Sequence, residues 1–299
     1  MRPSPWGPLH VADAHVHFFS PKFFSTLVSQ KPGLTLDAAQ QQLGWDLPES
    51  DPASLASRWI AELDRHQVDA SAVIASIPGD ESSVTLAANA HPGRLFACAM
   101  VNPRATWSTE ALHAVRTACL FPAMHAYSIQ DDCVRPVFEW AQREQRAVFV
   151  HCGVLSVGVR KKLGLPSPFD MRFSNPIDLH AVALKYPAVP IVVPHFGAGY
   201  FREALMLADL CPNVYLDTSS SNDWTKYHAP ALSLTEVFRR ALAVVGPSRL
   251  LFGTDSSFFP RGWQAGVFET QATILYELAV TEPDARAIFS ENFLRIMRR

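Results

Sequence analysis

Two kinds of hydrophobic pattern alternate along the chain. The first pattern is a short, nearly continuous apolar run, and residues 69–77 are an example. This run stops before Pro78 and Gly79, as buried parallel strands commonly do. Between these runs the apolar residues follow helical spacing, as Leu55, Trp59 and Leu63 do. The alternation predicts strands that are each followed by a helix.

The pattern predicts eight strands, at residues 11–17, 69–77, 95–101, 118–124, 147–151, 191–195, 214–217 and 250–252. Helices are expected from residue 52, at 82–90, 108–117, 131–145, 176–186, 200–210 and 234–245, and after the last strand at 264–279 and 283–297.

This order predicts an α/β fold in which helices cover a parallel sheet. Eight such units can close into a (β/α)8 TIM barrel, which typically needs ~250 residues. The 299 residues therefore form one barrel domain, 1–299, with room for an insertion after the first strand at Phe18 to Asp51. We expect short helices in that insertion, folded over the active-site mouth. An open doubly wound sheet is the alternative, but no Gly-x-Gly-x-x-Gly follows an early strand.

Polar residues stand at the ends of four apolar strands. His15 and His17 end the first strand, His151 and His195 each end a later one, and Asp255 follows the last. Strand ends converge at the carboxyl-end mouth of a barrel, where imidazole and carboxylate donors suit zinc and similar divalent ions. By itself, a His-x-His pair can also end a buried strand with only backbone partners.

Together these positions resemble the amidohydrolase superfamily, in particular the amidohydrolase-related branch that includes aminocarboxymuconate semialdehyde decarboxylase and lactone or ester hydrolases. The resemblance rests on Asp13-Ala14-His15-Val16-His17, Val150-His151-Cys152-Gly153, Pro194-His195-Phe196-Gly197, Asn213-Val214-Tyr215-Leu216-Asp217-Thr218-Ser219 and Gly253-Thr254-Asp255. It implies the barrel fold, and it implies that one divalent metal ion, Zn²⁺ or alternatively Mn²⁺, binds to His15, His17, His151 and Asp255. It also implies that His195 is a catalytic acid, base or polarising residue.

One departure from the superfamily bears on the number of metals. Many two-metal members carry a carboxylated lysine at the end of the fourth strand, and residues 120–125 contain no lysine. A single metal is therefore expected. His125 could act as a ligand or contact substrate, or it could be a loop histidine without a metal role.

The expected chemistry is hydrolysis of an ester, lactone or amide bond in a small carboxylated or aromatic molecule. A bound metal lowers the pKa of its water toward ~7, Asp255 accepts the water's proton, and His195 stabilises the oxyanion. Asp13 could orient the site from behind the ligands or simply bond to backbone.

Two other functions stay open. The first is non-oxidative decarboxylation of an unsaturated or aromatic carboxylic acid, which would need a cationic clamp, with Arg261 the best-placed candidate. The second is a barrel that binds a ligand or partner without catalysis. Such a protein would be expected to have lost at least one of the expected site residues, whereas all of them are present here, which argues against this function.

Composition narrows the partners and the location. A net charge of -2 and a pI near 6.6 give no reason to expect nucleic acid or an anionic membrane, so a small molecule is the expected partner. The N-terminal residues show no signal-peptide pattern, no apolar run approaches ~20 residues, and the five cysteines contain no Cys-x-x-Cys pair. These features predict a cytoplasmic enzyme with reduced thiols, and the resemblance adds the expectation of a homodimer.

Overall fold

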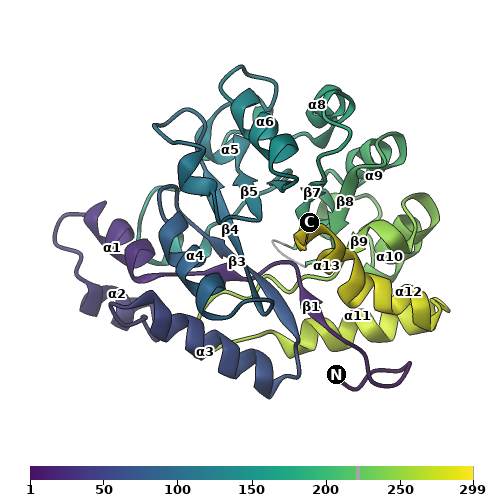
Figure 1. Ribbon diagram of the computed structural model, residues 1–299, viewed down its shortest axis with the longest axis horizontal. Helices are drawn as coiled ribbons and strands as arrows, with labels where there is room; N and C mark the ends of the chain where they lie inside the picture. The colour runs from purple at the N-terminus through teal and green to yellow at the C-terminus, as the bar shows by residue number, and fades with distance from the viewer. Residues whose placement is uncertain (220–222, 299) are drawn as a thin grey trace.

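The described strands form one parallel sheet in the computed structural model, which describes residues 1–219 and 223–298 (Figure 1). The order is β1-β3-β4-β5-β6-β7-β8-β9, and β2 also pairs with β3. The strands are β1 (Ala12–Asp13), β2 (His17–Phe18), β3 (Ala70–Ala75), β4 (Leu95–Val101), β5 (Thr117–Leu120), β6 (Ala147–Val150), β7 (Ile191–Val193), β8 (Val214–Asp217) and β9 (Leu250–Leu251).

The sheet closes on itself between its first and last strands. β1 and β2 are two parts of the predicted first strand, and both pair with β3 on one side. On the other side the segment from β1 to β2 bonds to the residues that follow β9. The closing bonds run from Ala14 N to Phe252 O (2.8 Å), from His17 N to Ser256 O (2.7 Å) and from Asp255 N to His15 O (3.0 Å). The predicted (β/α)8 barrel is therefore confirmed.

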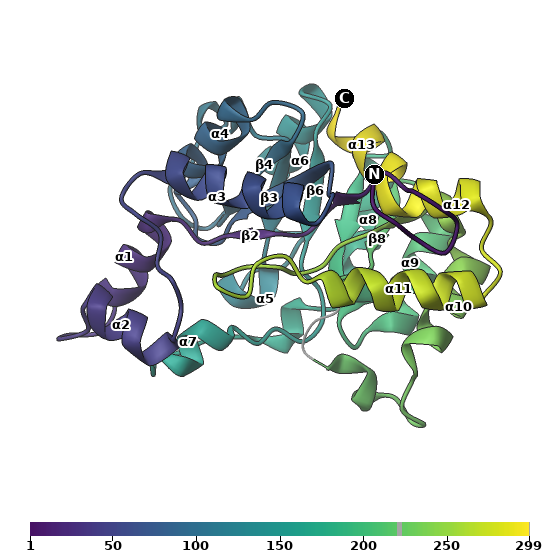
Figure 2. The ribbon, with the colours of Figure 1, turned by 90° about the horizontal axis from the view of Figure 1, so that it is seen from below.

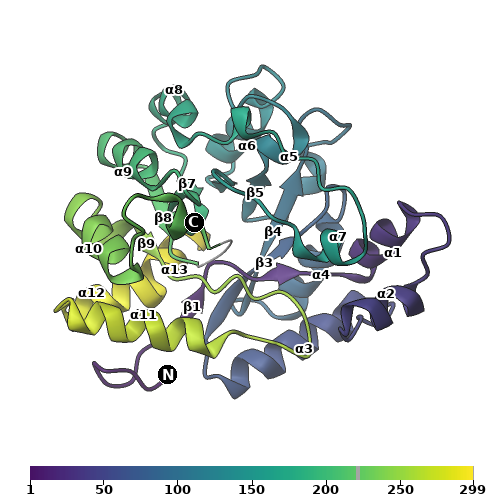
Figure 3. The same ribbon diagram turned by 180° about the vertical axis from the view of Figure 1, so that it is seen from behind.

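Most helices surround the strands in two opposite views, and α13 (Asn292–Met297) lies across one end of the barrel (Figures 1 and 3). The helices are α1 (Pro21–Ser29), α2 (Leu36–Leu43), α3 (Pro52–Arg65), α4 (Glu81–Ala90), α5 (Pro122–His125), α6 (Arg135–Arg143), α7 (Gly158–Lys162), α8 (His180–Lys185), α9 (Phe201–Leu210), α10 (Leu234–Val244), α11 (Ala265–Glu277), α12 (Glu282–Arg286) and α13. Single 3₁₀ turns lie at Glu110–Leu112, Met171–Phe173, Pro176–Leu179, Pro194–Gly197, Trp224–Tyr227 and Pro247–Arg249, and a π-turn at Ala287–Glu291 joins α12 to α13. No helix among the described residues combines the length and hydrophobicity needed to cross a membrane.

The segment after the first strand forms α1 and α2 because its sequence carries helix start signals. The Ser20 side chain accepts a hydrogen bond from Phe23 N at the start of α1, where Pro21 takes the first helical position. Thr35 caps α2 in the same way, and Gly44 ends it with a left-handed φ of 64°. Figure 2 shows these two helices beside α7 at one end of the molecule.

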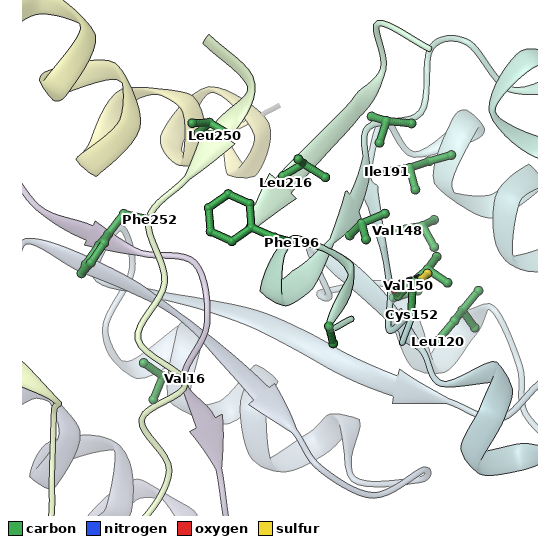
Figure 4. Close-up of a cluster of buried hydrophobic side chains, with 14 of the residues drawn as sticks. Val16, Leu120, Val148, Val150, Cys152, Ile191, Phe196, Leu216, Leu250 and Phe252 are labelled. Atoms are coloured by element: carbon green, nitrogen blue, oxygen red, sulfur yellow. Dashed lines mark hydrogen bonds between the residues drawn. The ribbon is translucent and has the colours of Figure 1, made fainter. Parts of the chain in front are cut away.

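Three hydrophobic clusters hold the elements together. One lies between the sheet and the surrounding helices, and Figure 4 shows Val148, Ile191, Leu216 and Leu250 of neighbouring strands within it. A second fills the barrel interior, where Phe293, Ile296 and Met297 of α13 join residues of β3, β4 and β6. The third joins α1 and α2 to α7 through Phe23, Phe24, Leu27, Leu43, Trp45, Val159 and Leu163.

The helix expected at residues 108–117 is wrong. Only Glu110–Leu112 forms a helical turn, and β5 already begins at Thr117, which pairs in register with Cys98 of β4 and Ala147 of β6. The same strand stops at Leu120 instead of residue 124 because Pro122 opens α5.

Candidate metal centre

His15, His17 and Asp255 lie together where the barrel closes. The two imidazole rings are 5.1 Å apart, and Asp255 Oδ1 lies 3.2 Å from His17 Nε2 and 3.7 Å from His15 Nε2. One donor atom from each of the three residues lies within 4.8 Å of the others. Because the bonds that close the sheet include Asp255 N to His15 O, the fold itself brings these residues together from opposite ends of the chain.

The Nδ1 atom is engaged by a neighbour in three of the site histidines. In metal sites such a partner fixes the ring's orientation and tautomer and leaves Nε2 free to bind the ion. The partners of His15, His17 and His195 are Asp217 Oδ2 (2.6 Å), Ser76 Oγ (2.8 Å) and Ser219 Oγ (2.8 Å) respectively. An ionised carboxylate only accepts, so Asp217 requires a proton on His15 Nδ1, and in the neutral ring the lone pair then lies on Nε2.

His151 and His195 lie beside this group. The ring of His195 is 4.9 Å from that of His15 and 5.5 Å from that of His151. His195 itself has a left-handed φ of 54°, because the chain turns sharply after β7 instead of continuing as a strand. His151 Nε2 is buried and finds no hydrogen-bond partner among the described residues. Buried polar atoms normally have partners, and at His151 a bound ion would supply one.

The charges of the site favour a bound cation. Burial raises the pKa of Asp255, but the hydrogen bond from His17 and the charge of His15 outweigh it and hold that pKa well below its usual range. Burial lowers the pKa of His15, yet the Asp217 carboxylate more than reverses this and raises it to about 9. Burial and the neighbouring His195 bring the pKa of His151 well below its ordinary value. At neutral pH the metal-free site therefore holds two carboxylates, Asp255 and Asp217, against one protonated imidazole, His15, while His151 is neutral.

These observations fit a divalent cation. The donors are imidazole nitrogens and a carboxylate oxygen, the buried His151 Nε2 has no partner among residues 1–219 and 223–298, and hydrogen bonds fix the orientation of the rings. His151 is not in the group whose donors lie within 4.8 Å, and it faces the same cavity from β6.

The site opens into a cavity of about 500 Å³. Its lining includes all five predicted site residues, His15, His17, His151, His195 and Asp255. The walls are aromatic and apolar, and two cationic side chains complete them. These wall residues include Phe19, Phe23, Trp45, Met100, Phe121, Met124, Leu155, Phe258, Lys162 and Arg261.

Two further residues from the sequence analysis have other surroundings. The Asp13 carboxylate accepts hydrogen bonds from His15 N (2.9 Å), Thr254 Oγ1 (2.5 Å) and Trp263 Nε1 (2.7 Å). It therefore holds backbone and neighbouring side chains in place and bonds to no imidazole. His125 ends α5 and is not among the residues that line the cavity, and burial lowers its pKa to about 4.

Sequence reasoning missed Asp217, Ser76 and Ser219 as partners of the site histidines. A signal for Asp217 was present, because it ends the apolar strand β8 in the way that the histidines end theirs. Ser76 follows β3 directly and carries no such mark, since a serine after a strand is common in loops.

Comparisons with known proteins agree with this geometry. A family model described as amidohydrolase matches residues 12–299. Among curated proteins, the protein fluG of Emericella nidulans is 38% identical over 87 residues, which cover 29% of this chain and 10% of that protein. The match thus spans about a tenth of the curated relative.

Two similar solved structures differ in their chemistry. The 5-carboxyvanillate decarboxylase of Novosphingobium aromaticivorans, complexed with manganese and 4-hydroxy-3-methoxy-5-nitrobenzoic acid, is 14% identical with a TM-score of 0.62 over 97% of this chain and 96% of that one. A probable 2-pyrone-4,6-dicarboxylic acid hydrolase of Acinetobacter baumannii, with citric acid bound, is 12% identical with a TM-score of 0.63 over 97% and 100%. At these identities the likeness establishes the barrel fold alone.

Proposed function

The chain belongs to the amidohydrolase family, and from this premise we propose that it is a metal-dependent hydrolase. Its substrate would be a small carboxylated or aromatic molecule with an ester, lactone or amide bond. The observation that carries the proposal is the position of Asp255, whose carboxylate lies beside both His15 Nε2 and His17 Nε2 in the lining of the cavity.

Each site residue has a role in this proposal. His15, His17, His151 and Asp255 would hold one divalent ion, Zn²⁺ or alternatively Mn²⁺. When bound, such an ion lowers the pKa of a coordinated water toward ~7 and so supplies a nucleophile at neutral pH. Asp255 is ionised at neutral pH, and its carboxylate would be the group that accepts a proton from the attacking water. His195, held through Nδ1 by Ser219, turns its other nitrogen toward the oxyanion that develops on the substrate.

A second candidate is non-oxidative decarboxylation of an aromatic or unsaturated acid. The aromatic walls of the cavity and its two cations favour it, and a barrel of the same fold is a decarboxylase that binds a nitrobenzoic acid. In this reaction the carboxylate carbon leaves as carbon dioxide, and His195, which lines the cavity, would deliver a proton to the carbon left behind.

We further propose that residues 18–51 cover the mouth of a single barrel domain spanning 1–299. Phe19, Phe23 and Trp45 of this segment line the cavity. Its helices pack against α7, and Lys31 Nζ donates to Leu163 O (2.9 Å) just beyond that helix. Such a cover would shape the space for substrate and exclude water from it.

The cellular setting is also a proposal. All five cysteines are free, which agrees with a reducing cytoplasm. A small-molecule substrate and a homodimer remain our expectations, and gel filtration with light scattering would test the latter.

Metal analysis followed by a substrate panel tests the function. Purified protein supplied with Zn²⁺ or Mn²⁺ should hold about one ion per chain, consistent with one set of clustered donors. Lactones, esters and unsaturated carboxylic acids are then scored for acid release and for carbon dioxide release. Acid release supports the hydrolase, carbon dioxide release supports the decarboxylase, and a protein that binds no ion after metal supply contradicts both.

A further inference from the structure

Two cations stand at the cavity without a carboxylate partner. Lys162 ends α7 and Arg261 lies between β9 and α11, and both line the same cavity as the histidines. Within the described part of the chain, no ion pair closer than 4.0 Å joins either cation to a carboxylate, whereas Arg172 pairs with Asp170 at 2.6 Å. The charges of Lys162 and Arg261 are therefore available to a ligand.

An aromatic pair links the two cations. The rings of Trp45 and Phe258 stack at 3.9 Å with an interplanar angle of 10°. The Arg261 guanidinium lies 4.4 Å from the centre of the Phe258 ring, and Lys162 Nζ lies 5.6 Å from that of Trp45. Arg261 also donates to Ser257 Oγ (2.8 Å), which limits the positions that its side chain can take. These contacts place each cation beside an aromatic ring of the cavity wall.

The negative charge of the cavity lies at the proposed metal site. Asp255 is the one carboxylate among the described residues that line the cavity, and in the proposed function it is committed to the metal ion. A ligand that reaches both regions would then meet a metal at one point and unpaired cations with aromatic faces at another. Its complement is a flat molecule with an anionic group that does not react.

We propose that Lys162 and Arg261, with Trp45 and Phe258, form an anion-binding subsite for a carboxylate on an aromatic or conjugated ring, separate from the group that reacts at the metal. The assignment deepens the proposed function and rests on it for the position of the reacting group. It makes the substrate an acid that keeps one carboxylate through the reaction. A substrate with a single carboxylate bound to the metal does not use this subsite.

Equilibrium binding to metal-loaded protein tests the subsite without any turnover. Calorimetry compares benzene-1,3-dicarboxylate with 3-carbamoylbenzoate, which keeps the shape and one carboxylate but replaces the other by a neutral amide. The wild-type protein should bind the dicarboxylate about tenfold to a hundredfold more tightly, the usual contribution of charge-assisted hydrogen bonds. Lys162→Gln and Arg261→Gln should remove most of that preference and change binding of the monoacid by no more than about twofold.

Controls separate the subsite from its surroundings. Arg202→Gln removes an exposed arginine that pairs with Glu203 outside the cavity, and it should keep the preference. Arg261 also contacts Asp255 O (3.3 Å), so the metal content of Arg261→Gln is measured as well. In the part of the chain that the structure describes, Lys162 Nζ makes no such contact with a site residue.

Some outcomes would overturn the assignment. They are equal wild-type affinity for the two ligands, no binding of either, or a preference that survives in both Gln variants. If the protein takes up no metal but still prefers the dicarboxylate through Lys162 and Arg261, the subsite stands and the proposed function fails.

Discussion

Asp217→Asn should weaken metal binding by acting on the orientation of His15. The Asp217 carboxylate accepts two hydrogen bonds, from His15 Nδ1 at 2.6 Å and from Ser219 N at 2.6 Å. An amide of the same shape has one oxygen and one NH₂ group, so it can accept only one of them. If the oxygen takes the Ser219 amide, the NH₂ group faces His15 Nδ1 and favours the tautomer with its proton on Nε2. That tautomer has no lone pair for the metal.

The size of the effect follows from known partners of metal-binding histidines. Loss of such a partner typically costs ten- to a hundredfold in metal affinity, or ~1.4–2.8 kcal/mol. Protons compete for the same ring, because Asp217 raises the pKa of His15 to about 9. At pH 7 the His15 ring of the variant would bind a proton less tightly than in the wild-type protein, so protons would compete less with the metal. This weaker competition would partly mask the loss of metal affinity. The comparison therefore belongs near pH 9, where competition in the wild-type protein is weaker.

The assay is titration of metal-free protein with Zn²⁺ or Mn²⁺ buffered by a chelator of known affinity. Asp69→Asn is the matched control, because Asp69 also pairs with a histidine, His10 Nδ1 at 3.1 Å, and neither residue lines the cavity. Equal affinity of wild-type protein and Asp217→Asn near pH 9, with both folded, would refute the argument from the tautomer.

Four other outcomes are expected. His15→Ala or Asp255→Asn should abolish turnover and lower the melting temperature little beyond the loss of metal; normal activity would contradict the site. His195→Asn should keep the metal and lose rate, and stoichiometric loss of metal would make His195 a ligand and reopen the question of a second ion. Trp45→Ala should raise KM more than it lowers kcat, because Trp45 lines the cavity from the covering segment; a selective fall in kcat would count against that role. In metal-free protein, the raised pKa of His15 adds stability that is full below pH 6.5 and is lost as the pH rises through about 9. The melting temperature of the metal-free protein should therefore fall over this pH range. The fall should be smaller in Asp217→Asn.

The barrel and its five cavity residues could be predicted because both follow from local patterns. An apolar run that ends in a histidine or an aspartate is visible in the sequence, and parallel strands bring such ends to one side. His151 and Asp255 are far apart in sequence but line one cavity for this reason. The rule was applied to four strands and not to β8, so Asp217 was left out although it fits the same rule.

Other features depend on contacts that no local pattern encodes. The apolar spacing near Leu112 and Val115 suggests a helix, but both side chains are buried against the sheet in an irregular segment because β5 must start at Thr117 to stay in register. The pairing of Trp45 with Phe258 joins two loops more than two hundred positions apart, so the sequence shows only that aromatic residues are present.

Closure of the sheet also has a consequence for its stability. The strand pair at the join contains His15 and His17 on one side and Asp255 on the other, so an ion bound to all three would tie the two ends of the barrel together. Ligand binding to the folded state slows every opening that breaks the site. Hydrogen exchange at the amides of Ala14 and His17, which bond across this join, should therefore slow on metal addition more than exchange in the middle of β6.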